Sequence, residues 1–94
     1  MEIPNSIKVA GVRYEVVDKE IVEIEGSTFY NGACNYDEAQ ILLLDSLTGD
    51  RKEQVFVHEL THAIFFEAGF EEQDEDMVNR LGIVLHQVLK DWGK

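Results

Sequence analysis

Two histidines and a glutamate stand at a spacing that suits a metal ion, in the run His58-Glu59-Leu60-Thr61-His62. On an α-helix, residues four apart lie nearly one above the other, so both imidazoles can face one zinc ion. Glu59 lies about 100° further round the helix, where it can reach a water molecule on that ion. Zinc acidifies such a water and polarises a carbonyl, and the carboxylate can take the proton. The HExxH pattern therefore predicts metal-assisted hydrolysis.

A catalytic zinc site also needs a third protein ligand and an open position for water. Five acidic residues and one histidine downstream of the motif could supply that ligand: Glu71, Glu72, Asp74, Glu75, Asp76 and His86. Glu75 and His86 are eleven residues apart, about 16 Å along one helix, so they cannot both bind the same ion. A helical hairpin folded back onto the motif places the ion between these two levels, and the geometry leaves the choice open. Without an ion, the motif is simply two helix histidines beside a solvated glutamate.

The motif lies in a segment that has the pattern of an amphipathic helix. Asp50-Arg51-Lys52-Glu53 matches a capping box, in which the first side chain accepts from first-turn amides and the fourth reaches back. Apolar residues then recur at helical spacing as far as Gly69, a typical stop, which predicts a helix over about 50–68. A second helix is predicted over about 74–92, with a wide apolar stripe that ends at Trp92.

The first half of the chain has the alternating pattern of β-strands, over about residues 6–45. Asn31-Gly32 is a strong hairpin signal because both residues tolerate positive φ. Residues 39–45 carry four consecutive apolar side chains, typical of a strand with both faces partly covered. Strands followed by helices favour an α+β fold, and we expect a small, mostly antiparallel sheet of three or four strands followed by a two-helix hairpin. A length of 94 residues predicts a single domain over residues 1–94.

The composition excludes several kinds of partner. Nineteen acidic residues against eight basic ones give a formal net charge of −11, which disfavours binding to nucleic acid or to an anionic membrane. Apolar runs such as 41–44 are too short to span a bilayer, and the N-terminal residues lack the pattern of a signal peptide. Cys34 is the single cysteine, so no intrachain disulfide can form. We expect a cytoplasmic protein.

The motif and the segment downstream of it resemble the ImmA/IrrE-like HExxH metallopeptidases, in particular the small stand-alone versions carried by phages and mobile elements. The resemblance rests on His58-Glu59-Leu60-Thr61-His62-Ala63 and on Glu75-Asp76-Met77-Val78-Asn79-Arg80-Leu81-Gly82. In that family a glutamate stands three residues ahead of a small or branched apolar residue, commonly followed by asparagine. Glu75 stands in that register ahead of Val78-Asn79. The similarity covers about residues 32–91, and its most specific part is the HExxH motif.

The resemblance implies that His58, His62 and Glu75 bind Zn²⁺ and that Glu59 is the general base, in the manner of a gluzincin with a minimal zincin-like core. Asp76 is the main rival of Glu75 as third ligand, with a side chain one methylene shorter that points about 100° away, and His86 comes after both. Larger relatives carry an additional helical layer for which this chain has no room. We therefore expect a substrate cleft that is shallow or completed by a partner.

These observations predict a zinc-dependent endopeptidase that acts on a peptide or protein substrate, and some relatives cut repressor proteins. If the strand at residues 39–45 is the sheet edge beside the zinc, an extended peptide could pair with it as an additional strand. The alternative function is a zinc-binding adaptor module that acts through protein–protein contact without cutting its partner. A third and plainer hypothesis is a metal-free helical hairpin that serves dimerisation.

Overall fold

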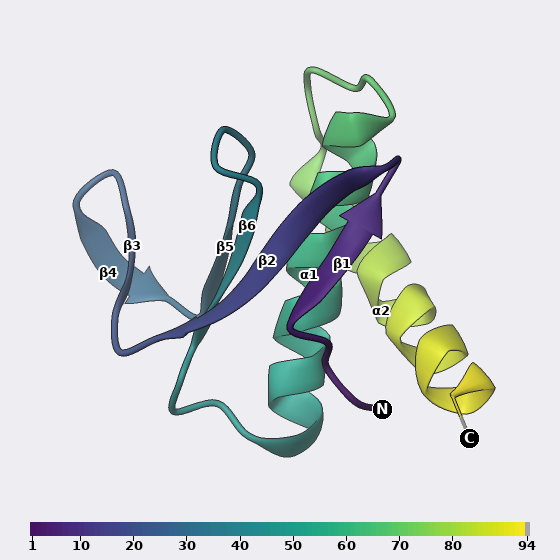
Figure 1. Cartoon of the computed structure of the whole chain (residues 1–94), viewed down its shortest axis with the longest axis horizontal. Coiled ribbons are helices and arrows are strands. Elements are labelled where there is room, and N and C mark those ends of the chain that lie inside the picture. The colour runs from purple at the N-terminus through teal and green to yellow at the C-terminus, as the bar shows by residue number, and fades with distance from the viewer. Residues whose placement is uncertain (94) are drawn as a thin grey trace.

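The computed structural model describes residues 1–93 and has the α+β architecture expected, with all strands ahead of both helices (Figure 1). The first helix packs against the sheet, and the second packs against the first. The elements run in the order β1 (Ser6–Val9), β2 (Val12–Lys19), β3 (Val22–Ile24), β4 (Ser27–Tyr30), β5 (Gly32–Asn35), β6 (Gln40–Leu44), α1 (Gly49–Glu67) and α2 (Glu75–Trp92).

The main sheet has four strands in the order β1-β2-β6-β5. The β1–β2 and β5–β6 pairs are antiparallel hairpins, which confirms the expectation of a mostly antiparallel sheet. β2 and β6 pair in parallel, and the chain between them crosses over through a separate two-stranded ribbon made of β3 and β4. The ribbon extends away from the helices (Figure 1). The alternation of apolar and polar residues predicts neither this ribbon nor the parallel pairing of β2 with β6.

The strand predicted at residues 39–45 forms as β6, but it does not lie at the sheet edge. β6 lies between β2 and β5, and the side chains of Ile41 and Leu43 are fully buried. Four consecutive apolar residues favour this position because both faces of an interior strand can be covered. The hypothesis that a peptide adds to this strand is therefore wrong. The edge strand on this side is β5.

The predicted hairpin at Asn31-Gly32 is also wrong, since β4 pairs with β3 and β5 pairs with β6. The β3–β4 turn lies at Glu25 and Gly26, whose φ angles are +50° and +85°. Gly32 instead allows a close approach between β5 and α1. A Cβ at Gly32 would lie 2.6 Å from Cγ1 of Val55 and 3.2 Å from Cγ of Glu59. The glycine therefore holds the edge strand against the helix that carries the HExxH motif.

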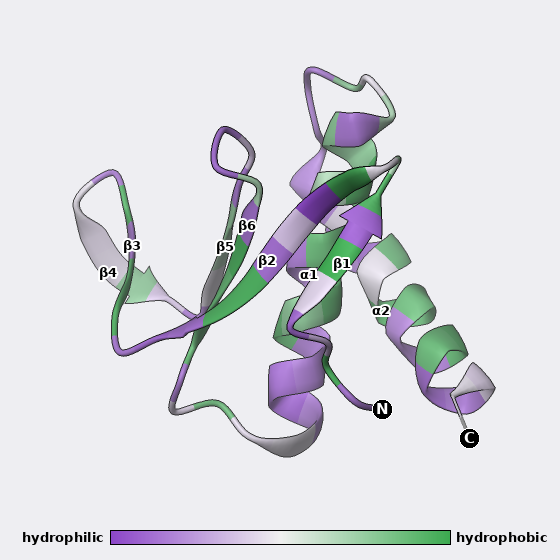
Figure 2. Ribbon diagram, in the orientation of Figure 1, coloured by the Kyte–Doolittle hydropathy of each residue, from purple (hydrophilic) through white to green (hydrophobic). Residues whose placement is uncertain are grey.

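The core lies between the sheet and α1. Buried side chains of β2 and β6 meet those on one face of the helix: Tyr14, Ile41, Leu43, Phe56, Val57, Leu60 and Ala63. Figure 2 shows β2 as hydrophobic where its valines lie and hydrophilic at the residues between and after them. The hydroxyl of Tyr14 donates a hydrogen bond of 2.7 Å to Glu67 in the last turn of α1. This contact fixes the helix along the sheet and so fixes the direction in which its histidines point.

α1 lies close to the predicted range, but the predicted capping box does not form. The helix begins at Gly49 after the N-cap residue Thr48, which makes no side-chain capping bond. Asp50 forms an ion pair with Lys90 of α2, and Glu53 lies 3.0 Å from Nε2 of His86. Both acidic residues therefore join α1 to α2 instead of bonding to first-turn amides.

α2 begins close to its predicted start, and its N-cap is Asp74, whose Oδ1 accepts hydrogen bonds from the amides of Asp76 and Met77. The apolar residues of α2 fall into a buried group and an exposed group. Val78 is fully buried, whereas a line of side chains on the outward side is between 42% and 82% exposed: Met77, Leu81, Val84, Val88 and Trp92. Hydrophobic residues occur along the whole helix (Figure 2), more than α1 alone can cover. Within residues 1–93 no helix has the length and apolar character needed to cross a membrane.

Candidate metal centre

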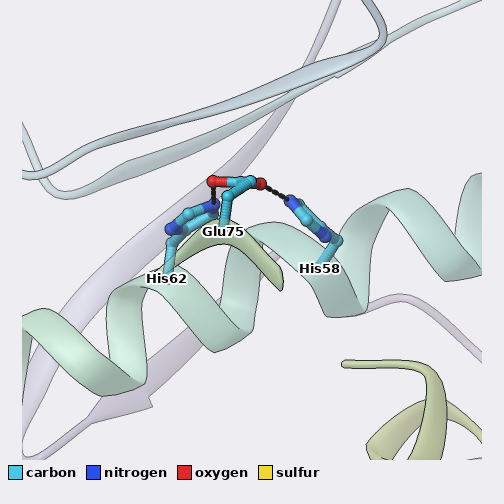
Figure 3. A group of neighbouring side chains, drawn as sticks. All are labelled: His58, His62 and Glu75. Atoms are coloured by element: carbon cyan, nitrogen blue, oxygen red, sulfur yellow. Dashed lines mark hydrogen bonds and ion pairs between the residues drawn. The ribbon is translucent and has the colours of Figure 1, made fainter. Parts of the chain in front are cut away.

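The two motif histidines and Glu75 meet at one point between α1 and the start of α2 (Figure 3). Nε2 of His58 lies 2.9 Å from Oε1 of Glu75, and Nε2 of His62 lies 3.4 Å from Oε2 of the same carboxylate. One candidate ligand atom from each residue lies within 4.8 Å of the other two. The structure thus brings together the three residues implied as ligands by the resemblance.

The spacing and types of these atoms fit Zn²⁺. Bonds of about 2.0–2.1 Å at tetrahedral angles separate ligand atoms by about 3.4 Å. The contacts of 2.9 and 3.4 Å involve different oxygens of Glu75, and one ligand atom from each of the three residues lies within 4.8 Å of the other two, so side-chain adjustments would bring them to this separation. Two imidazole nitrogens and a glutamate oxygen are also a ligand set of known catalytic zinc sites. The side chain of Glu75 is 69% exposed, so this side of the triad faces solvent.

The helix packing explains why Glu75 reaches the histidines. Gly82 lies where α2 crosses α1, and a Cβ at this position would lie 3.6 Å from Cα of His58. A methyl group would touch the first helix, and a larger side chain would move the helices apart. Glu75 precedes Gly82 by seven residues, or about two turns, so it projects from the same face of α2. The close crossing therefore directs this carboxylate at His58.

The rival third ligands lie elsewhere. Asp76 points away from the triad and forms an ion pair of 3.8 Å with Arg80, one turn later on α2. His86 is 9% exposed and bonds to Glu53, the fifth residue of α1. Within residues 1–93 the triad is the one group of at least three potential ligands that meet in this way. Neither Asp76 nor His86 belongs to it.

Glu59 is buried beside the triad, with 8% of its surface exposed. Burial raises the pKa of its carboxyl to about 7, the charge of Glu75 raises it as well, and His62 acts in the opposite direction. A cation held by the triad would favour the ionised form. The ionised carboxylate can accept a proton, which is what a general base requires.

A residue that the sequence analysis did not identify, Gln73, connects His62 to the sheet. Its side-chain oxygen lies 2.7 Å from Nδ1 of His62, and its amide nitrogen donates to the hydroxyl of Tyr36 at 2.9 Å and to the carbonyl of His62 at 3.3 Å. Because the carbonyl of His62 can only accept, the amide nitrogen faces it and the oxygen faces Nδ1. Nδ1 then carries the proton, and Nε2 is free to bind a metal.

We expect Gln73→Leu to lower the affinity for Zn²⁺ by about 10-fold, because an outer contact that orients a ligand typically contributes about 10–100-fold. Leucine has a similar size but can make none of the three hydrogen bonds. Gln73→Glu retains an acceptor for Nδ1, so its affinity for Zn²⁺ should fall less than that of Gln73→Leu. Competition with a chromophoric chelator measures the affinity. Equal affinities of Gln73→Leu and the wild type would show that the bridge does not orient the histidine.

No pattern in the sequence marks Gln73 as a functional residue. It lies in the loop between Gly69 and the N-cap Asp74, outside both helical periods. The ring of Tyr36, its partner, stacks on Phe66 of α1 at a centroid distance of 4.2 Å. Its hydroxyl, however, faces the loop and the metal centre. Only the folded hairpin brings these groups together.

A hollow opens beside the triad, between α1, β5 and the β3–β4 ribbon. Its lining comprises the triad and Glu59, together with Ile24, Tyr30, Gly32, Ala33, Cys34 and Tyr36. Burial, followed by the charges of Glu59 and Glu67, raises the pKa of the Cys34 thiol to about 12. The thiol therefore stays protonated at neutral pH, and only a thiolate would compete as a ligand. The edge strand and the metal centre thus share one open groove.

Comparison with protein-family models, with curated proteins and with solved structures finds no match for the chain. The resemblance to the ImmA/IrrE-like metallopeptidases therefore rests on the quoted motifs alone.

Proposed function

We propose that the protein is a zinc-dependent endopeptidase. The observation that carries the proposal is that ligand atoms of His58, His62 and Glu75 lie within 4.8 Å of one another, a ligand set that catalytic zinc sites use, with Glu59 buried next to them. Zn²⁺ in this position would supply a Lewis acid that polarises the scissile carbonyl and acidifies a water. We also propose a cytoplasmic location, and a repressor or other regulatory protein as a possible substrate by resemblance.

Glu59 performs the proton transfers in this proposal. Its carboxylate takes a proton from the attacking water and gives it to the nitrogen of the leaving amine, so the net reaction adds water across the peptide bond. Its burial next to the triad places this carboxylate beside the candidate ion and away from bulk water. Gln73 keeps His62 in the tautomer whose Nε2 faces the site. No further base is needed.

The edge of β5 provides backbone groups that can align a substrate. The amide of Leu44 donates to the carbonyl of Asn31, and since an antiparallel ladder alternates, the amides and carbonyls of Gly32 and Cys34 point away from β6. An extended peptide can bond to these groups as an additional strand. Because the contacts involve the backbone, they place a scissile bond near the triad with little sequence preference.

Zinc-dependent cleavage of a complex peptide pool tests the proposal. Protein loaded with one equivalent of Zn²⁺ should cut peptides internally, as seen by mass spectrometry. A chelator should stop the reaction, and added zinc should restore it. His58→Ala, purified in parallel, serves as the control for a contaminating protease. Cleavage that is unchanged in this variant, or absent from the zinc-loaded wild type, would contradict the proposal.

A zinc-binding adaptor remains the second candidate. The outward stripe of α2 favours it, because a contiguous apolar surface often marks a site of protein contact. The adaptor needs an intact metal site but no accessible fourth position. Stoichiometric zinc without cleavage of any peptide would favour the adaptor over the endopeptidase.

A further inference from the structure

The groove continues from the triad into a recess at the N-terminal half of α1. The recess is lined by His58 and Glu59, which also line the hollow of the metal centre, and by four other polar residues: Asn31, Arg51, Gln54 and Asn79. Tyr30 and Gly32 also belong to both. A substrate held at the triad would therefore extend directly into this recess.

Arg51 lies on the same face of α1 as the metal centre. Arg51, Val55, His58 and His62 follow one another at intervals of four, three and four residues, which is the spacing of one helical face. The seven residues from Arg51 to His58 span about 10 Å along the axis. An extended peptide advances about 3.3 Å per residue, so this distance corresponds to about three substrate residues. Because the arginine side chain is long, its guanidinium can reach toward the triad and shorten the distance to the scissile bond.

The charge of Arg51 has no counter-ion within residues 1–93. Neighbouring basic residues are paired, since Lys52 contacts Asp18, Arg80 contacts Asp76 and Lys90 contacts Asp50. Arg51 is exposed and forms neither a hydrogen bond nor an ion pair in the described part of the chain. The other polar residues that line only the recess carry neutral amides. The recess therefore combines one guanidinium without a counter-ion with amides that can donate hydrogen bonds, and its acidic residue, Glu59, lies at the end shared with the metal centre.

We infer that the recess binds a carboxylate of the substrate, two or three residues from the bond that is cut, with Arg51 as the specificity-determining residue. A guanidinium binds a carboxylate through two parallel hydrogen bonds, and the side-chain amides around it can donate further ones. This inference rests on the proposed endopeptidase function. It adds a substrate class, peptides with an acidic group at a defined distance from the scissile bond.

The direction of β5 predicts on which side of the scissile bond the carboxylate lies. Gly32 lies against Val55 of α1, and Tyr36 stacks on Phe66 one strand-length later, so β5 and α1 run in the same direction along the groove. A peptide paired antiparallel to β5 has its C-terminal part next to Arg51. The carboxylate is then either an aspartate or glutamate side chain after the scissile bond, or the C-terminus of the substrate.

Matched peptides test the inference. Starting from one peptide that the zinc-loaded protein cuts, the second and third residues after the cut are each changed to Glu, Gln or Lys, with either a free or an amidated C-terminus. We expect Glu to exceed Gln by about 10–100-fold in kcat/KM, because a hydrogen-bonded charge pair contributes this much. If the ligand is the C-terminal carboxylate, a peptide shortened to end at the second or third residue after the cut should have a higher kcat/KM. Amidation of that C-terminus should abolish the increase.

Variants of Arg51 show whether this residue carries the preference. Arg51→Ala should cut Glu and Gln peptides equally, and Arg51→Glu should prefer Lys. Arg80→Ala removes the same charge on the outer side of α2 and should keep the preference for the acidic group. If the wild type cuts Glu and Gln peptides equally, or if Arg51→Ala keeps the preference, the inference is overturned while the endopeptidase function stands. Absence of any zinc-dependent cleavage overturns both.

Discussion

Replacing Glu59 with glutamine is expected to lower the rate of peptide hydrolysis by about 10²–10⁴-fold while the protein still binds zinc. Glutamine matches the shape of glutamate but cannot accept the proton of the attacking water. Glu59 is not one of the three residues that meet at the candidate metal centre, so the ligand set stays complete. A buried amide at this position also avoids the cost of burying a charge, so we expect the fold to persist.

Single-turnover rates on a peptide that the wild type cuts, together with zinc affinity from chelator competition, measure the two effects of this variant. Glu38→Gln, in the exposed turn between β5 and β6, makes the same chemical change away from the groove and should retain full activity. Loss of zinc in Glu59→Gln would show that Glu59 helps to hold the ion. Full activity of Glu59→Gln would show that another group acts as the general base.

The helices were predictable because their signals are local. The HExxH spacing, the apolar period and Gly69 all act within a few turns, and they place α1 close to its observed range. α2 also begins close to its predicted start, at Glu75 after the N-cap Asp74. The failure at Asp50 and Glu53 has a physical cause, since both side chains have stronger partners on α2 than the amides of their own helix.

The sheet order was not predictable from alternation. The parallel pairing of β2 with β6 joins residues that are about 25 positions apart in the sequence, with a ribbon between them, and no local pattern encodes it. Gly32 was taken for a turn residue because Asn-Gly is common in turns. Its actual requirement is steric, and a steric requirement depends on where Val55 and Glu59 lie after folding.

In the candidate site too, some residues follow from local spacing and others depend on how the chain folds. His58 and His62 follow from spacing alone, since one helix presents both. The contribution of Glu75 depends on how α2 crosses α1 at Gly82, so spacing left Asp76 and His86 open as alternatives. The positions of Gln73 and Arg51 relative to the groove arise only when the loop, the strand edge and the helix come together.

Glu75→Gln is expected to lower the affinity for Zn²⁺ by more than about 100-fold, whereas Asp76→Asn should change it by less than about 3-fold. Removing an outer contact of a ligand costs about 10–100-fold, and the loss of a ligand should cost more. The carboxylate of Glu75 lies between Nε2 of both histidines, and that of Asp76 pairs with Arg80. The two variants remove the same charge from adjacent positions of α2, so each controls for the other.

Chelator competition at constant pH gives the zinc affinities, and thermal unfolding with and without zinc reports whether binding still stabilises the fold. A ligand that binds only the folded state raises its stability by an amount that depends on affinity, so Glu75→Gln should lose most of the zinc-dependent increase in Tm. His86→Gln should lower Tm without zinc, because it weakens the contact with Glu53, yet keep the zinc-dependent increase. If Asp76→Asn or His86→Gln lost zinc and Glu75→Gln kept it, the two helices would have to pack differently around the ion, with another face of α2 turned toward His58.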